Sequence, residues 1–355
     1  MSMPNLTYAQ AIHQALRDAL QSDERVILIG EGVPDPKGIF NTTSGLQQTF
    51  GSHRVFDMPL SENAMTGICL GASTHGMRPV LVHQRIDFSL LSLDQLMNHA
   101  AKWHYLFNGQ VIAPMVIRLI IGRGWGQGPQ HSQALHGLFA AIPGLKVVLP
   151  TFAQDAYGMM RSAISDNNPV VFIEHRWLHS VQGQLSDSSD SDDLSSARVV
   201  RQGAHITLAA WSLMVVEALN AAQALAQFGI ELCIIDMRVA HRFDCDPVIE
   251  SLKETGRLIV ADLGHTHAAL GQALIGEVCQ SHFGLLQQAP TLIANPNYPV
   301  STSHFQVEDY YVGAKEMVQQ ALVMFNKTEL QAQVLEKLVI STRHDVPNQQ
   351  FTGPF

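Results

Sequence analysis

The sequence has few cysteines, an excess of acidic over basic residues and no long apolar run. Its four cysteines, Cys69, Cys233, Cys245 and Cys279, show no CxxC spacing, so we expect reduced thiols rather than a disulfide or a zinc site. The 22 basic and 31 acidic residues give a net charge of −9, which disfavours a nucleic-acid partner. No apolar run reaches membrane-spanning length, and residues 1–10 do not resemble a signal peptide. We therefore expect a cytoplasmic protein with no membrane partner.

A second absence concerns ligand binding. No Gly-Asp-Gly with a following Asn occurs, so the sequence has no such element to hold a metal ion together with a diphosphate. It does contain Ser61-Glu62 at the start of one apolar segment, and Gln130-His131-Ser132-Gln133 about seventy residues later. This carboxylate and this histidine can converge on one pocket. The combination predicts half of an active site, completed by another protein.

The sequence is long enough for two domains, and its 46% hydrophobic content is typical of well-buried α/β proteins. Continuously apolar segments alternate with segments of helical periodicity, which predicts parallel sheets covered by helices on both faces. In the first part of the chain we predict strands at 26–29, 79–82, 116–121, 147–150 and 170–173, and helices at 8–20, 61–76, 92–107 and 153–165.

A run of serine and aspartate at 186–193 interrupts this pattern. Such residues bury no apolar area, so we predict a first domain at 1–185 and a solvated acidic linker at 186–198. A second α/β domain is predicted at 199–340, followed by a tail at 341–355. Its predicted strands are 206–209, 232–235 and 258–260, and its helices are 214–227, 247–255 and 268–280.

Glu62 begins a helical segment that is rich in glycine and alanine. Two interpretations are open from spacing alone. A carboxylate at a helix N-terminus is stabilised by the helix dipole, with Ser61 as the capping residue. The same carboxylate can serve a ligand site, because the two cases look alike in sequence.

His131 is one of 17 histidines, and its setting distinguishes it. It follows the glycine-dense run 122–128, where a backbone can approach a ligand closely. This run is neither a phosphate-binding P-loop nor a dinucleotide-binding GxGxxG turn. Phe88 follows the strand at 79–82 at its carboxyl end, the edge where ligands bind in open α/β sheets. It is expected either to stack on a heterocycle or to lie in the core.

Several motifs in order along the chain resemble the β subunit of thiamine-diphosphate-dependent 2-oxo acid dehydrogenases, the E1 component of the pyruvate and branched-chain complexes. The resemblance covers nearly the whole chain. Its carriers are Gly30-Glu31, Gly38-Ile39-Phe40, Thr43-Ser44-Gly45-Leu46, Phe50-Gly51, Arg54-Val55, Pro59-Leu60-Ser61-Glu62, Gly76-Met77-Arg78-Pro79, Asp87-Phe88, Gln130-His131-Ser132-Gln133, Pro143-Gly144-Leu145-Lys146-Val147-Val148 and Asp166-Asn167-Asn168-Pro169-Val170.

This resemblance implies a pyrimidine-binding domain followed by a transketolase C-terminal-type domain. It also implies an α2β2 heterotetramer in which the cofactor, thiamine diphosphate, lies between subunits. The α-type partner would hold the diphosphate and Mg²⁺, which accounts for the missing Gly-Asp-Gly element. A lipoyl acyltransferase is a further implied partner, and K⁺ a further implied ion.

The resemblance also implies roles for individual residues. Glu62 matches the glutamate that hydrogen-bonds N1′ of the aminopyrimidine, and Phe88 the aromatic residue that packs on this ring. His131 matches the histidine that assists the substrate or the later acyl transfer. The matching residues of a structural monovalent-cation site are Ala163, Ile164, Asp166 and Asn168.

Some residues depart from the family pattern. Arg85 adds a charge near Phe88, and Arg123 and Trp125 are bulky where pyruvate enzymes have small or polar residues. We expect these three side chains to shape a substrate pocket for a 2-oxo acid that the sequence does not name. Two other functions stay open: the split half of a transketolase-like carbon–carbon ligase, and a scaffold subunit without catalytic activity.

Overall fold

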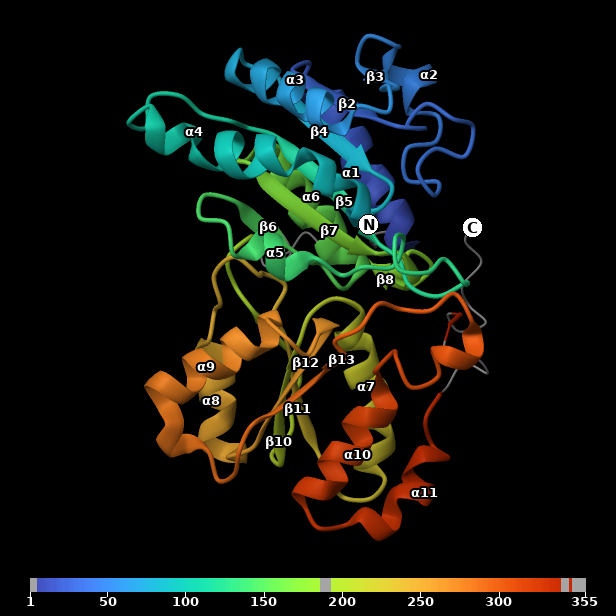
Figure 1. Ribbon diagram of the computed structural model, residues 1–355, viewed down its shortest axis with the longest axis vertical. Helices are drawn as coiled ribbons and strands as arrows, with labels where there is room; N and C mark the ends of the chain where they lie inside the picture. The colour runs from blue at the N-terminus through green and yellow to red at the C-terminus, as the bar shows by residue number, and fades with distance from the viewer. Residues whose placement is uncertain (1–4, 186–192, 340–344, 347–355) are drawn as a thin grey trace. The chain divides into compact units, whose positions relative to one another are not determined.

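The computed structural model describes residues 5–185, 193–339 and 345–346 (Figure 1). Most of the expected acidic linker, 186–192, and most of the expected tail, 341–355, lie outside these residues. The chain forms two compact units. The first comprises Met1–Gly122, Leu138–Leu194 and Gln349–Phe355, and the second comprises Arg123–Gly137 and Ser195–Asn348. The glycine-dense segment that carries His131 therefore belongs to the second unit.

The first unit contains a six-stranded sheet in which every neighbouring pair is parallel, with the order β3-β2-β4-β5-β7-β6. Its central strands β5 and β7 are buried along their whole length and mostly apolar, as expected for a sheet covered on both faces. A separate antiparallel pair joins β1 and β8. The strands are β1 (Asn5–Thr7), β2 (Val26–Gly30), β3 (Val55–Phe56), β4 (Arg78–His83), β5 (Val116–Ile121), β6 (Lys146–Val148), β7 (Val170–His175) and β8 (Gln182–Gln184).

Helices cover this sheet in two groups. α1 and α6 pack on each other and on the sheet, while α3 and the helical run that precedes α4 pack on β4 (Figure 1). α1 begins in a capping box, because Thr7 Oγ1 accepts from the Gln10 amide at 3.2 Å and Gln10 Oε1 accepts from the Thr7 amide at 2.9 Å. The helices are α1 (Tyr8–Ser22), α2 (Leu46–Phe50), α3 (Glu62–Thr74), α4 (Ala101–Leu106), α5 (His136–Ala140) and α6 (Ala153–Ser165), with 3₁₀ helices at Ile86–Ser92 and Arg176–Leu178 and a π-helical stretch at Gln95–Ala100.

The second unit contains a five-stranded sheet with the order β13-β12-β10-β11-β9, in which only β9 runs antiparallel to its neighbour. α8 and α9 lie on one side of this sheet and α7 and α10 on the other (Figure 1). The elements are β9 (Arg198–Arg201), β10 (Ile206–Ala210), α7 (Leu213–Ala226), β11 (Leu232–Asp236), α8 (Asp246–Thr255), β12 (Leu258–His265), α9 (Leu270–His282), β13 (Thr291–Asn295), α10 (Ala314–Met324) and α11 (Gln331–Leu335), with 3₁₀ helices at Phe283–Leu285, His304–Gln306 and Thr328–Leu330.

Both units are therefore α/β layers around a mostly parallel sheet, which confirms the predicted fold class. In the part of the chain that the structure describes, no helix is both long enough and apolar enough to cross a bilayer.

Candidate active site

Three carboxylates gather at the carboxyl edge of the first sheet. Glu31 directly follows β2, Asp57 directly follows β3, and Glu62 is the first residue of α3. Backbone and amide contacts hold the loops in place: the Gly32 amide donates to Asp57 Oδ1 at 3.0 Å, and Gln84 Nε2 donates to the Glu31 carbonyl at 3.0 Å. Because parallel strands all end at one edge, residues far apart in sequence meet here.

The carboxyl group of Glu31 is partly buried and lies near other carboxylates. Burial raises the pKa of Glu31, and the nearby charges of Glu62 and Asp57 raise it further. Glu31 Oε1 is buried without a hydrogen-bond partner among the described residues. Glu62 is 8% exposed, and within the same described residues no hydrogen bond to its carboxylate is found. Buried polar groups are normally paired, so this pair is suited to a ligand that brings hydrogen-bonding groups.

The structure decides part of the question about Glu62 and Ser61. Ser61 is the N-cap residue of α3, as expected, but its side chain makes no capping hydrogen bond. Glu62 still lies in the first turn, where the helix dipole favours a carboxylate. The dipole thus helps to keep an unpaired, buried carboxylate at this position.

Phe88 lies in the 3₁₀ helix that follows β4, and this helix packs against α3. Its ring is half-buried, and its amide donates to the Arg85 carbonyl at 3.2 Å. The fold therefore brings the Phe88 segment and the helix that begins with Glu62 to the same part of the first unit. An aromatic ring and a carboxylate suit a flat, basic heterocycle.

Arg85 belongs to a buried group that the sequence did not indicate. Its guanidinium carbon lies 5.2 Å from the centre of the Phe40 ring, and that of Arg176 lies 4.2 Å from the same ring. Burial lowers the pKa of Arg176 to about 10, and the charge of Arg85 contributes to this shift. Arg85 is thus part of the packing around Phe40, and its role in a substrate pocket stays a prediction.

A second buried group lies next to Phe40. Arg118 Nη2 approaches Glu174 Oε1 at 2.5 Å, and His179 Nε2 lies 3.3 Å from Glu174 Oε2. Although burial opposes ionisation, the charge of Arg118 and the nearby His179 hold the pKa of Glu174 below its ordinary value. Arg118 and Glu174 lie on neighbouring strands two register positions apart, and only strand pairing reveals this contact.

The segment with His131 is held against residues of the second unit. The Gly124 amide donates to the Tyr311 hydroxyl at 3.1 Å, and the Trp125 amide donates to the Asp345 carbonyl at 2.7 Å. The Arg123 guanidinium carbon lies 4.8 Å from the centre of the Tyr311 ring, and burial lowers the pKa of Arg123. His131 itself is exposed. Arg123 and Trp125 thus have clear structural contacts, and their assignment to a substrate pocket stays a prediction.

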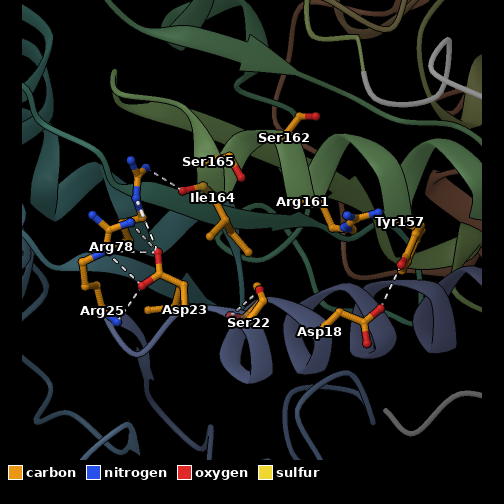
Figure 2. Close-up of a pocket in the computed structure, with 12 residues that line it drawn as sticks. Asp18, Ser22, Asp23, Arg25, Arg78, Tyr157, Arg161, Ser162, Ile164 and Ser165 are labelled. Carbon is orange, nitrogen blue, oxygen red and sulfur yellow. Dashed lines mark hydrogen bonds and ion pairs between the residues drawn. The ribbon is translucent and has the colours of Figure 1, made fainter.

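The residues of the implied cation site lie at the C-terminal end of α6. The carbonyl of Ile164 accepts a hydrogen bond of 2.9 Å from Nη1 of Arg78 (Figure 2). The carbonyl of Asp166 accepts another of 2.9 Å from the same nitrogen. The Asp166 carboxylate accepts from the Asn168 amide at 2.8 Å and pairs with Lys146. Both carbonyls thus accept hydrogen bonds from the Arg78 guanidinium, and the assignment of a monovalent cation to these residues stays a prediction. Ala163 is the fourth residue of this predicted site.

A cleft of about 500 Å³ opens beside Arg78, between the C-terminal parts of α1 and α6 (Figure 2). Arg25 pairs with Asp23 there at 2.8 Å, and this hydrogen bond lowers the pKa of Asp23 to about 2. The cleft lies where β2 and β4 begin, whereas Glu62 and Phe88 lie where the parallel strands end. It therefore has no part in the carboxylate site. Among the described residues, no group of three or more His, Cys, Asp or Glu is arranged to bind a metal ion.

Comparison with known proteins identifies both domains. The transketolase pyrimidine-binding domain matches residues 4–180, and the transketolase C-terminal domain matches residues 195–318. A β subunit of acetoin:2,6-dichlorophenolindophenol oxidoreductase from Cupriavidus necator is 37% identical over 86% of this chain and 93% of its own length. The pyruvate dehydrogenase E1 β subunit of Rickettsia bellii is 35% identical over 81% of this chain and 90% of its own. The chain belongs to the transketolase-like family of E1 β subunits.

A further E1 β subunit, that of Bacillus subtilis pyruvate dehydrogenase, is 37% identical over 78% of this chain and 85% of its own. Among solved structures, a split-gene transketolase described as an inactive β4 tetramer superposes with a TM-score of 0.72. It covers 92% of this chain at 19% identity, which supports the shared fold alone. Within this E1 β-type fold, the candidate site consists of the carboxylates at the edge of the first sheet and the Phe88 segment.

Proposed function

We propose that this E1 β-type chain is one half of a heteromeric, thiamine-diphosphate-dependent enzyme. The complete enzyme decarboxylates a 2-oxo acid and transfers the acyl group to an acceptor. The observation that carries this proposal is the carboxylate of Glu62, which is buried at the carboxyl edge of a parallel sheet with no hydrogen-bond partner among the described residues. The Glu62 side chain is only 8% exposed and accepts no hydrogen bond from the described residues, so its carboxylate is open to an aminopyrimidine nitrogen with which it can share a proton.

In this proposal each residue has a defined task. Bound thiamine diphosphate supplies the carbon that attacks the substrate and the ring that accepts the electron pair released with CO₂. Glu62 holds a proton at N1′ of the aminopyrimidine, and Glu31 helps to keep that proton in place because the two carboxyl groups disfavour a second negative charge. Phe88 packs on the pyrimidine ring. His131 holds or delivers a proton at the substrate or the acyl group.

The proposed partner is an α-type chain. Large apolar side chains are exposed on α3 and in the segments beside it: Leu60 is 81% exposed, Ile68 59% and Leu91 64%. A side chain added at Gly71 of the same helix would meet no atom of this chain within 4 Å. Apolar surface of this kind next to a site marks a protein interface. We assign it to the α-type chain of an α2β2 heterotetramer, which holds the diphosphate and Mg²⁺.

Three finer assignments complete the proposal. The acyl acceptor is a lipoyl group on an acyltransferase partner, and the enzyme works in the cytoplasm. A K⁺ ion is assigned to Ala163, Ile164, Asp166 and Asn168, mostly through their backbone carbonyls. This ion is structural, because its ligands lie at the opposite edge of the sheet from Glu62.

The decisive test is Glu62→Gln in the enzyme assembled with a partner that co-purifies with the tagged chain. Glutamine keeps the shape of the side chain but changes the proton that it can share at N1′. We expect the 2-oxo acid-dependent reduction of an artificial acceptor to fall by about 10²–10⁴-fold. Glu254→Gln, an exposed change on α8, is the matched control and should retain the wild-type rate.

Isotope exchange at C2 of the bound cofactor separates this role from a structural one. Exchange should slow together with turnover in Glu62→Gln. If exchange in Glu62→Gln proceeds at the wild-type rate, the role assigned to Glu62 is wrong, even when the overall activity is low.

A second candidate substrate class comes from the relatives themselves. One of them is named for acetoin and others for pyruvate, at similar identity. Acetoin contains a hydroxyketone in place of a 2-oxo acid, so cleavage releases an aldehyde rather than CO₂. Measuring CO₂ release from pyruvate and acetaldehyde release from acetoin with the same preparation decides between the two classes.

A further inference from the structure

The segment that carries His131 is connected at both ends to elements of the first unit but is packed on the second. It leaves β5 at Gly122 and enters α5 at His136. Its first part is held by the contacts of Gly124 with Tyr311 and of Trp125 with Asp345. A side chain added at Gly124 would lie 2.0 Å from the Asp345 carbonyl oxygen, so only glycine permits this approach. Gly124, Gly126 and Gly128 all have positive φ angles.

The other end of the segment contains a buried pair. His136 Nε2 lies 2.7 Å from Asp262 Oδ1, and the two residues are 1% and 0% exposed. They are 126 residues apart in the sequence. Asp262 lies in β12, and its carboxylate also accepts from the Gly264 amide at 2.8 Å and the Gly271 amide at 2.7 Å. Two backbone amides of the second unit therefore fix this carboxylate independently of His136.

The electrostatics of this pair define its protonation. Burial alone would raise the pKa of Asp262, but His136 and the two backbone amides outweigh burial and hold it below its ordinary value. Asp262 is thus an acceptor at neutral pH, and His136 must carry its proton on Nε2. His136 Nδ1 is buried without a hydrogen-bond partner in the described part of the chain. The pair therefore has one directed contact, from Nε2 to Asp262.

His131 precedes this contact by five residues, and at most about 3.3–3.6 Å of chain per residue separates them. Without the anchor, His131 would sample positions many ångströms apart. A reacting group must be held to within about 0.5 Å, and a misplacement of 1 Å can lower a rate by about 100-fold. Anchoring at both ends therefore matters more for His131 than for an ordinary surface loop.

We propose that His136 and Asp262 are positioning residues that fix the His131 segment on the second unit. Asp262 in β12 thereby helps to hold the segment whose histidine the proposed function assigns to the substrate or the acyl group. This inference rests on the proposed function, because only a catalytic role of His131 requires that its segment be held in place. Sequence reasoning did not single out His136, because neither its spacing nor its neighbours distinguish it from the other histidines.

The test uses three substitutions of His136 in the assembled enzyme. His136→Leu fills a similar volume but removes the donor, whereas His136→Gln places an amide N–H at nearly the same reach as Nε2. We expect kcat to fall at least 10-fold in His136→Leu and to stay within 3-fold of wild type in His136→Gln. If His136→Leu does not fold, His136→Asn replaces it, because its amide is too short to reach Asp262. His282→Leu, at the C-terminal end of α9, is the matched control.

Two readouts separate positioning from general damage. Isotope exchange at C2 of the cofactor depends on Glu62 and should stay within 2-fold of wild type in His136→Leu. Hydrogen–deuterium exchange of the peptide 122–135 should accelerate at least 5-fold, while peptides of β10 and β12 keep their protection. A kcat within 2-fold of wild type, or unchanged exchange of 122–135, would overturn the inference.

His131→Ala, measured in parallel, distinguishes failure of this inference from failure of the proposed function. If His131→Ala is inactive while His136→Leu is fully active, the anchoring role is wrong and the role of His131 stands. If His131→Ala retains full activity, the catalytic role proposed for His131 fails, whatever the exchange of the 122–135 peptide shows.

Discussion

The two sheets share one architecture, but they differ in the hydrogen bonding of the carboxylates near the carboxyl ends of their strands. At the carboxyl edge of the first sheet, Glu62 has no hydrogen-bond partner among the described residues, and the pKa of Glu31 is raised. In β12 of the second sheet, Asp262 accepts from His136, Gly264 and Gly271, and its pKa is lowered. At the first edge the Glu62 carboxylate and Glu31 Oε1 have no donor among the described residues, whereas Asp262 in the second sheet has three donors.

This difference separates a ligand site from a structural one within the same fold. A carboxylate with three donors contributes to stability and has little capacity left for a ligand. A buried carboxylate without donors reduces stability and is retained where a ligand supplies them. The comparison therefore predicts that replacing Glu62 lowers activity with little loss of stability, whereas replacing Asp262 lowers stability as well as releasing the His131 segment.

The largest effect is expected from Glu62→Gln, which should lower turnover by about 10²–10⁴-fold. The same substitution should leave the thermal midpoint of the chain without cofactor unchanged or slightly raised, because it removes a buried charge without a partner. Differential scanning calorimetry of the isolated chain measures this midpoint. A large drop in the midpoint would show that Glu62 is a structural residue like Asp262, and would break the comparison.

Asp262→Ala should be the most damaging substitution for stability. It leaves His136 and two backbone amides without their acceptor, and breaking a buried hydrogen-bonded pair costs about 3–5 kcal/mol. Urea denaturation, followed by a signal from the second unit, measures the loss. Glu254→Ala on the exposed face of α8 is the control and should lie within about 0.5 kcal/mol of wild type. A loss below about 1 kcal/mol for Asp262→Ala would contradict the structural role.

Gly124→Ala should have a smaller but specific effect on the second unit. Its φ of +82° is unfavourable for alanine, and the added carbon would collide with the Asp345 carbonyl. We expect a loss of about 1–3 kcal/mol, typical of a strained backbone position. Gly276→Ala in α9 is the matched control: its added carbon meets nothing within 4 Å, so helix propensity predicts a gain of up to about 1 kcal/mol. Equal effects of the two substitutions would refute the close approach.

Glu31→Gln is expected to have the smallest effect, with a defined dependence on pH. The folded-state pKa of Glu31 is raised above its ordinary value of 4.5, so ionisation destabilises the fold as pH rises through and above that value. Glu31→Gln removes this penalty and should raise the thermal midpoint by about 1–3 °C at pH 7, with little difference at pH 4. Thermal scans across this pH range would contradict the assignment if the difference were the same at both ends.

Local patterns in the sequence were sufficient to predict most of the fold. The predicted strand at 116–121 and the predicted helix at 153–165 have the observed bounds. The predicted helix at 8–20 is two residues longer in the structure and ends at Ser22. The segment 92–107 is helical as predicted, although residues Gln95–Ala100 adopt the wider π-helical form. These elements were predictable because the spacing of apolar residues along a short segment indicates which faces are buried.

Other elements carried too weak a local signal. β1, β3 and β8 have two or three residues each, which is too short for a periodic pattern to appear. β9 is half-buried along its whole length, as expected for an edge strand, and β13 lies at the other edge of the same sheet. Pairing partners define such strands, and partners cannot be recognised from the local sequence.

The candidate site divides in the same way. Glu62, Phe88 and His131 were assigned by family resemblance, and the structure brings the segments of Glu62 and Phe88 together in the first unit. Glu31 appeared only as part of a family motif, although its place directly after a buried strand was a usable signal. The pair of Arg118 with Glu174 and the pair of His136 with Asp262 had no signal of this kind.

By itself, the sequence determined that this protein is a two-domain α/β chain of the E1 β type whose site lacks a diphosphate element. It did so because hydrophobic periodicity and short motifs are properties of neighbouring residues. Only the tertiary structure decided which carboxylates are satisfied and which are left for a ligand. Hydrogen bonding depends on where distant residues meet, as Asp262 and His136 do across 126 positions of the chain.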